Sequence, residues 1–256
     1  MITKEIITNN FSKYARSYDQ YCSIQNACAL KLDDKIGKKE YSNILEIGCG
    51  TGNYTILLRN RFPTTKIKAL DISQEMIEVA EMKLKRTHLE FIVADAEVMS
   101  FDEQFDFISS NATFQWFRNL EQTLTKCYEL LDKNGVILFS MFGPLTFNEL
   151  NASLRELFNQ DISISSCSFV SKIKMKQILE NIFGENTIIE EEILKEEYES
   201  LLELLAKIKY TGTRGNGIYN RNVWTPRAIE HLERIYRQRY KKIVATYQVL
   251  FCRATK

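Results

Sequence analysis

The stretch that most constrains this chain is a short apolar run that breaks into three glycines at alternate positions. Residues 44–52 read Ile-Leu-Glu-Ile-Gly-Cys-Gly-Thr-Gly, and residues 53–58 then resume the spacing of a helix. This pattern predicts a strand, a tight turn and a helix start. Because glycine has no Cβ atom, it can adopt positive φ and leave room for a small molecule against the backbone. The stretch therefore predicts a ligand site.

The glycine spacing argues against two common nucleotide sites. A dinucleotide site has the spacing G-x-G-x-x-G, but this chain has G-x-G-x-G, and Asn53 stands where the last glycine would be. The phosphate-binding pattern G-x-x-x-x-G-K-[ST] does not occur. Glu46, just before the turn, would repel a pyrophosphate but attract an ammonium group. We therefore expect a cofactor that carries an amino-acid group and no phosphate.

Four motifs in succession resemble the class I S-adenosylmethionine-dependent methyltransferases. The pattern E-x-G-x-G-x-G is the first, Asp71 ends a second strand, Asp95 ends a third and Asn111 ends a fourth. In that family the acid after the second strand takes the ribose hydroxyls, and the Asp after the third binds the adenine amino group. The alternative interpretation is a glycine turn followed by three solvated loop acids.

The resemblance predicts S-adenosylmethionine as the cofactor, with S-adenosylhomocysteine as its product. The expected cofactor-binding residues are Tyr18, Glu46, Gly48, Cys49, Gly50, Gly52, Asp71, Ile72, Met76, Asp95, Ala96, Glu97 and Asn111. Met76 has a second interpretation, because a methionine at helical spacing is often plain core. No metal site is expected, since the six cysteines are scattered without a C-x-x-C pair and only His88 and His231 could assist them.

Apolar strand-like runs alternate with helical patterns from residue 43 to residue 141, which predicts an α/β fold with a parallel sheet. The resemblance implies a class I methyltransferase Rossmann-like fold: a mainly parallel seven-stranded sheet with helices on both faces and an antiparallel last strand. Expected strands cover 44–47, 66–70, 89–93, 105–109, 135–141, 186–198 and 243–252. Expected helices cover 53–61, 74–85, 119–131, 147–159 and 172–183, with a helical segment over 9–36.

We expect a single domain over residues 1–256. Its predicted parts are an N-terminal helical lid (1–40), a core (41–198 and 241–256) and a helical cap insertion (199–240). Residues 10–19 resemble the F-x-x-x-A-x-x-Y-D opening of many small-molecule methyltransferases, which folds over the cofactor. Tyr18 would then close the site, although the aromatic residues of this segment could also serve packing alone.

The block Ser110 to Phe117 carries two adjacent aromatic residues and a glutamine beyond a strand end. In the family the pattern S-N-x-x-x-Q-W marks enzymes that methylate small acids, so Gln115 and Trp116 are substrate-binding candidates. The alternative is that the aromatic residues cover the sheet edge. A sulfonium methyl is already activated and an ionised carboxylate needs no general base, so we predict no catalytic acid or base. Tyr18, Gln115 and Trp116 are candidates to align the substrate.

The whole chain is similar to the malonyl-[acyl-carrier protein] O-methyltransferase family of biotin biosynthesis. The resemblance implies an enzyme, a carboxyl O-methyltransferase, that methylates the free carboxylate of the malonyl thioester to give the methyl ester that primes pimeloyl synthesis. It also implies an acidic acyl-carrier protein as partner. Lys209 or Arg214 could hold the malonyl carboxylate by charge-assisted hydrogen bonds, and the alternative is that each is an ordinary solvated cation.

Charge is unevenly distributed although the formal net charge is only +1. From Lys207 to Lys256 there are twelve Lys or Arg against two acids, a basic region that suits an acidic carrier protein. Residues 185–203 hold eight glutamates against one lysine, which predicts a solvated face. No long basic stripe or base-flipping motif favours nucleic acid.

No apolar run is long enough for a membrane span or a signal peptide, so we expect a cytoplasmic protein with no membrane partner. The oligomeric state is left open. Two other functions also stay open: a carboxyl methyltransferase for another small acid such as aconitate, and a non-catalytic protein that binds S-adenosylmethionine.

Overall fold

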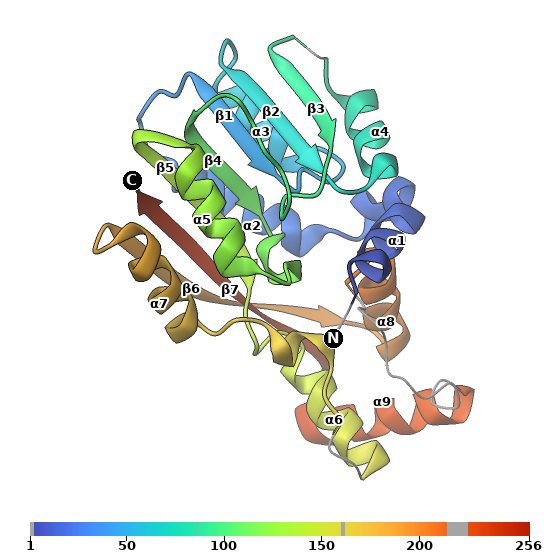
Figure 1. Cartoon of the computed structure of the whole chain (residues 1–256). Helices are drawn as coiled ribbons and strands as arrows, with labels where there is room; N and C mark the ends of the chain where they lie inside the picture. The colour runs from blue at the N-terminus through green and yellow to red at the C-terminus, as the bar shows by residue number, and fades with distance from the viewer. Residues whose placement is uncertain (1–2, 86, 160–161, 214–224) are drawn as a thin grey trace.

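The computed structural model describes residues 3–85, 87–159, 162–213 and 225–256 (Figure 1). Within these ranges, seven strands form one sheet in the order β3-β2-β1-β4-β5-β7-β6. Neighbouring strands from β3 to β5 are parallel, whereas β7 is antiparallel to both β5 and β6. The strands are β1 (Asn43–Ile47), β2 (Lys66–Asp71), β3 (Leu89–Val93), β4 (Phe105–Asn111), β5 (Leu131–Phe142), β6 (Thr187–Tyr198) and β7 (Ile243–Thr255). The predicted fold class is confirmed.

Helices cover both faces of the sheet, and one apolar cluster lies between the sheet and the helices on each face. In Figure 1, α5 lies in front of the sheet and α2 behind it. Helices α5 and α7 bury their apolar residues against one face, while α2, α3, α6, α8 and α9 contribute to the cluster on the other. The helices are α1 (Lys4–Tyr14), α2 (Ser23–Asp34), α3 (Asn53–Arg61), α4 (Gln74–Lys83), α5 (Leu120–Leu130), α6 (Asn148–Phe158), α7 (Lys172–Phe183), α8 (Leu201–Tyr210) and α9 (Pro226–Tyr240).

Local sequence explains why these elements form. In β1, Ile44, Leu45 and Ile47 are fully buried, because a central parallel strand is covered on both faces and reads as a continuous apolar run. Helix α4 starts where the Ser73 side chain accepts a hydrogen bond from the Met76 N–H, as an N-cap should. In α9, Thr225 caps the helix and Pro226 takes its first position.

Several predicted boundaries differ from the structure. The N-terminal segment begins at Lys4 rather than residue 9, and a 3-10 helix, η1 (Ala15–Gln20), divides it into α1 and α2. The helix predicted to reach residue 85 ends at Lys83. Strand β5 starts at Leu131 rather than 135, because Leu131 pairs with Phe105 before a register shift. Two further 3-10 turns, η2 (Phe114–Trp116) and η3 (Ser165–Ser168), complete the elements.

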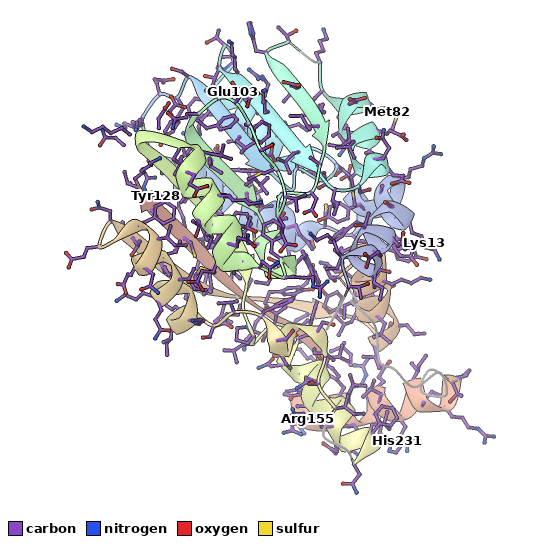
Figure 2. All side chains as sticks on the ribbon, in the orientation of Figure 1. Lys13, Met82, Glu103, Tyr128, Arg155 and His231 are labelled. Carbon is purple, nitrogen blue, oxygen red and sulfur yellow. The ribbon has the colours of Figure 1, made fainter. Side chains whose placement is uncertain are left out.

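Helices α6, α8 and α9 lie toward the lower end of the molecule as Figure 1 shows it. Tyr198 at the end of β6 pairs with Ile243 at the start of β7, so the chain leaves and re-enters the sheet at one point around α8 and α9. Helix α9 contacts α6, and Figure 2 shows Arg155 on α6 and His231 on α9 at this end of the molecule. The division into lid, core and cap stays a prediction.

The glutamates of strand β6, predicted to form a solvated face, also form ion pairs with lysines of neighbouring helices. Lys31 of α2 and Lys35 at its C-cap pair with Glu192 and Glu190, while Lys172 of α7 pairs with Glu191 from the other face. Side chains alternate between the two faces of a strand, so consecutive glutamates meet lysines on opposite sides. The strand charge is therefore matched by the helices that cover it.

Candidate functional site

A cavity opens at the carboxyl ends of β1 to β4, where ligands bind in open α/β sheets. The structure brings together twelve of the residues predicted for the cofactor and substrate. They are Tyr18, Gly48, Cys49, Gly50, Asp71, Ile72, Met76, Asp95, Ala96, Glu97, Asn111 and Trp116. The strand order places Asp95, Asp71, the glycine turn and Asn111 in a row across this edge.

The glycine turn between β1 and α3 is held by its neighbours through backbone atoms. The Gly48 and Cys49 N–H groups both donate to the Leu70 carbonyl, at 2.7 and 2.9 Å. The Gly50 N–H donates to Asp71 Oδ2 at 2.9 Å. All three glycines of the turn have positive φ, with values of 71°, 53° and 84° in chain order. The conformation of the turn is therefore set by contacts within the protein.

Asp71 ends β2 and faces the cavity beside this turn. Its Oδ1 accepts a hydrogen bond from the Ser73 N–H at 2.9 Å, and its Oδ2 accepts the Gly50 N–H. Burial raises the pKa of Asp71 above its ordinary value, although the backbone N–H groups of Ser73 and Gly50 act to lower it. Each carboxylate oxygen keeps capacity for a further donor, such as a hydroxyl.

At the β3 end of the cavity, Asp95 and Glu97 meet a lysine from the first helix. The Lys4 ammonium pairs with Asp95 and lies 2.8 Å from Glu97 Oε2. Burial alone would lower the pKa of Lys4, but its hydrogen bonds to Asp95 and Glu97 raise it above the usual value. Sequence reasoning missed Lys4, because it precedes the expected helix and no local pattern links it to a strand end ninety-one residues away.

Glu46 lies beneath the turn rather than in the lining of the cavity. Only 1% of its surface is exposed, and its Oε2 atom has no hydrogen-bond partner among the described residues. Burial raises the pKa of Glu46 to about 8, against an opposing interaction with Thr55. Burial therefore favours the protonated form of this carboxyl near neutral pH.

Asn111 ends β4 with its side-chain amide fixed by the protein. Its Nδ2 donates to the Gln25 carbonyl at 3.0 Å, and its Oδ1 accepts from Ser140 Oγ at 2.7 Å. The first contact joins the start of α2 to the end of β4. Asn111 thus lines the cavity with both ends of its amide already engaged.

Aromatic residues from the N-terminal segment cover one side of the cavity. Phe11 makes an edge contact with Trp116 at a centroid distance of 6.0 Å and also contacts Tyr18. Trp116 in turn meets Phe169 at 5.4 Å. The Phe11 ring also lies against Gly212, where a Cβ atom would come within 2.8 Å of the ring. These contacts join the rings into one aromatic cluster at the edge of the cavity.

A second group of rings joins the N-terminal segment to α8. Tyr210 at the end of α8 stacks on Tyr21 at 4.6 Å and makes an edge contact with Tyr14 at 5.2 Å. The segment predicted as a lid is therefore fastened both to the sheet edge and to α8.

Three other predicted residues, Gly52, Gln115 and Lys209, do not line the cavity. Gly52 is the N-cap of α3 and does not line the cavity. Gln115 is buried next to it, where its Nε2 donates to the Ala112 carbonyl and its Oε1 accepts the Phe142 N–H. Lys209 is exposed, with its ammonium 5.0 Å from the centre of the Tyr210 ring. Arg214 lies outside the described residues.

Further lining residues were not predicted as site residues. Lys4, Ile7, Gln25 and Asn26 belong to no motif that marks a site, whereas Thr51, Asn53 and Thr113 lie within the motifs but were not singled out. In the described part of the chain, no three His, Cys, Asp or Glu residues gather as a metal site would require. The six cysteines are free thiols, and only Cys167 is exposed. No helix in the described ranges has the length and apolar character of a bilayer span.

Comparison with known proteins gives consistent matches over nearly the whole chain. A family model described as "Methyltransferase domain" matches residues 45–139. The chain is 38% identical over 242 residues to malonyl-[acyl-carrier protein] O-methyltransferase 2 of Ilyobacter polytropus, covering 94% of this chain and 92% of that protein. It is 34% identical to malonyl-[acyl-carrier protein] O-methyltransferase of Acetivibrio thermocellus, covering 100% of this chain and 95% of the relative.

Solved structures resemble the chain in fold. A putative methyltransferase from Bacillus halodurans has a TM-score of 0.62 at 16% identity, and the match covers 90% of this chain and 99% of that one. The plantazolicin methyltransferase in complex with SAH has a TM-score of 0.50 at 18% identity, covering 99% and 90% of the two chains.

Proposed function

Because the chain belongs to the malonyl-[acyl-carrier protein] O-methyltransferase family, we propose that it methylates the free carboxylate of a malonyl thioester on acyl-carrier protein, with S-adenosylmethionine as donor. The observation that carries this proposal is the row of Asp95, Asp71 and the glycine turn along one cavity at the sheet edge. In the family the product is a malonyl methyl ester thioester, which serves biotin biosynthesis.

The lining of the cavity fits this cofactor. Apart from the neighbours of Gly50 in the chain, no atom of the described residues lies within 4 Å of the position that a Gly50 Cβ would take, so a ligand can approach the backbone there. Lys4 is the only Lys or Arg among the described lining residues, and it is paired with two carboxylates. An acidic lining without a free cation suits a cationic ligand better than a phosphate.

Asp71 would hold the ribose hydroxyls and Asp95 the adenine amino group, with Ile72, Met76 and Ala96 beside them. When bound, S-adenosylmethionine supplies a methyl group already activated by the sulfonium. The remaining task of the protein is to align the carboxylate and exclude water. The rings of Phe11, Tyr18 and Trp116 support the second task.

The proposal needs no general base. A malonyl carboxylate is ionised at neutral pH, so it could accept a methyl group from the bound cofactor, which would leave as neutral S-adenosylhomocysteine, without any proton having to be removed. Accordingly, we assign no acid or base role to any residue of the cavity. Tyr18 and Trp116 line it and are candidates to align the acid, whereas Gln115 would act from behind it by holding Ala112 and Phe142 in place. Lys209 and Arg214 remain proposed contacts for the malonyl carboxylate.

The proposed partner is the acidic carrier protein, and its docking surface is the exposed basic side of α9. Arg227, Arg234 and Lys241 are exposed there and make no ion pair with the described residues. Helix α9 contacts α8, which meets the lid through Tyr210. The proposal includes a cytoplasmic location, which suits six free thiols.

Methyl transfer can be tested with purified protein, labelled S-adenosylmethionine and malonyl-carrier protein. We expect label in the carrier fraction and a mass increase of one methylene on the malonyl group. Acetyl-carrier protein, which has no free carboxylate, should stay unlabelled. Free malonate and aconitate test the nearer alternative function. Binding of S-adenosylhomocysteine without methylation of any of these acids would contradict the proposal and favour a non-catalytic binding protein.

A further inference from the structure

One buried polar atom at the cavity, the side-chain oxygen of Gln25, has no hydrogen-bond partner in the part of the chain that the structure describes. Gln25, in the first turn of α2, is 8% exposed and lines the cavity. Its Oε1 atom is inaccessible to solvent and accepts no hydrogen bond from the described residues. Buried polar atoms in native proteins are almost always paired, so an unpaired carbonyl oxygen beside a ligand cavity indicates a missing donor.

The position of Gln25 indicates which part of a ligand would supply that donor. Its backbone carbonyl accepts the Asn111 Nδ2, so Gln25 lies at the end of β4. Asp95 follows β3, at the opposite end of the row β3-β2-β1-β4. A ligand whose adenine lies at Asp95 and whose ribose lies at Asp71 has its amino-acid end near the glycine turn and β4.

The other acceptors predicted for this end are less suited to the role. Glu46 does not line the cavity, and burial raises the pKa of its carboxyl to about 8. The Asn111 Oδ1 already accepts from Ser140 Oγ, which holds its amide in one orientation. Among these groups, the Gln25 Oε1 is the lining oxygen that is both buried and unpaired.

We infer that Gln25 is a cofactor-positioning residue, whose side-chain carbonyl accepts a hydrogen bond from the ammonium group of the S-adenosylmethionine amino-acid end. The inference rests on the proposed function and adds a residue that the sequence motifs do not include. By holding the ammonium, Gln25 fixes the amino-acid arm that ends at the sulfonium, and so helps to orient the methyl group toward the acid. A neutral acceptor does this without placing a second buried carboxylate beside Glu46.

The test measures binding of S-adenosylhomocysteine and of its analogue without the amino group, by calorimetry in the absence of substrate. In Gln25→Met, S-adenosylhomocysteine should bind about 10-fold to 100-fold more weakly, as expected for a lost hydrogen bond to a charged group. Binding of the desamino analogue should not change. Gln25→Glu retains an acceptor oxygen and should keep most of the affinity for S-adenosylhomocysteine.

Gln115→Met is the matched control, because Gln115 is also 8% exposed but both ends of its amide are partnered by the protein. We expect it to lower thermal stability without distinguishing the two ligands. Equal losses for both ligands in Gln25→Met, or no loss for either, would overturn the inference while the proposed function stands. Failure of the unmodified protein to bind S-adenosylhomocysteine would overturn the proposed function itself.

Discussion

The three glycine positions of the turn differ in what an added side chain would contact. A Cβ on Gly48 would lie 2.3 Å from Thr113 Oγ1, so packing excludes a side chain there. A Cβ on Gly52 would make a tight 3.1 Å contact with the Ala80 Cβ, and the positive φ of 84° also favours glycine. A Cβ on Gly50 would meet nothing within 4 Å. At Gly50 the free space belongs to the cavity, and a side chain there would compete with a ligand.

Gly50→Ala therefore tests the ligand space rather than the fold. Both Gly50 and the distant Gly37 have positive φ and no atom within 4 Å of an added Cβ. Alanine at either position should cost roughly 1–2 kcal/mol of unfolding free energy. We expect only Gly50→Ala to weaken S-adenosylhomocysteine binding, by about tenfold or more. Similar affinities for the two variants, measured by calorimetry, would contradict the assigned role of the turn.

Glu46 should make the free energy of unfolding depend on pH. Burial raises its pKa from 4.5 to about 8, so the folded state holds this proton more tightly than the unfolded state does. The stabilising contribution of the proton is fully present below pH 4.5 and is lost as the pH rises toward 8.

Between pH 4.5 and about 8, the free energy of unfolding should fall by up to about 1.4 kcal/mol per pH unit because of Glu46. Glu46→Gln should flatten the curve of unfolding free energy against pH between 5 and 8, as measured by urea denaturation of the ligand-free protein. Glu78→Gln, at an exposed position of α4, is the control and should leave the slope unchanged. The same slope in Glu46→Gln and the unmodified protein would show that Glu46 is not the group responsible.

At the scale of single elements, α1 depends on contacts made far away in the sequence. Helices of its length are marginal in water, so tertiary contacts must hold its 11 residues. The Lys4 ammonium reaches Asp95 and Glu97, Ser12 Oγ lies 2.9 Å from Ser73 Oγ, and Phe11 meets Trp116. These contacts hold α1 against the start of α4 and against the residues that line the cavity.

Lys4→Met should loosen this helix. The ion pair is partly exposed, so we expect the free energy of local opening of α1 to fall by about 1 kcal/mol. The α1 amides should then exchange about fivefold faster. Exchange is measured by mass spectrometry of peptides that cover residues 4–14. Lys13→Met is the control, because Lys13 points outward at the other end of the helix (Figure 2). If both variants exchange at the rate of the unmodified protein, Lys4 does not anchor α1.

Across the whole molecule the formal net charge is only +1, but basic and acidic residues gather in different regions. Arg237, Arg239 and Lys242 pair with Glu233, Glu156 and Glu197. Other cations of α9 and the turn after it stay exposed without such partners in the described structure. An acidic protein would be attracted to this side, and such attraction acts mainly on the rate of association.

Arg234→Glu should therefore raise KM for malonyl-carrier protein, by about fivefold at low salt, and the effect should shrink as salt is added. Steady-state methylation assays measure both. Affinity for S-adenosylhomocysteine should not change, since Arg234 does not line the cofactor cavity. Lys133→Glu is the control, because Lys133 is exposed near the start of β5, at the opposite end of the sheet from the cavity. An equal effect of both variants would indicate a nonspecific charge effect rather than docking on α9.

Residue patterns alone predict the alternation of strands and helices, the glycine turn and the placing of Asp71, Asp95 and Asn111 at strand ends. These features are local, because hydrophobic periodicity, glycine at positive φ and helix capping depend on neighbouring residues. The carboxyl ends of parallel strands share one edge, so strand-end residues could be assigned to one site without knowing how the helices pack.

The three-dimensional packing of the chain was needed to show which side chains complete that site. Lys4 meets Asp95 across ninety-one positions, and Gln25 meets Asn111 across eighty-six, because the N-terminal helices fold back over the sheet edge. It also placed Glu46 beneath the turn and engaged both ends of the Gln115 amide within the protein. Such contacts depend on how helices pack against the sheet, and the spacing of residues along the chain carries no record of that packing.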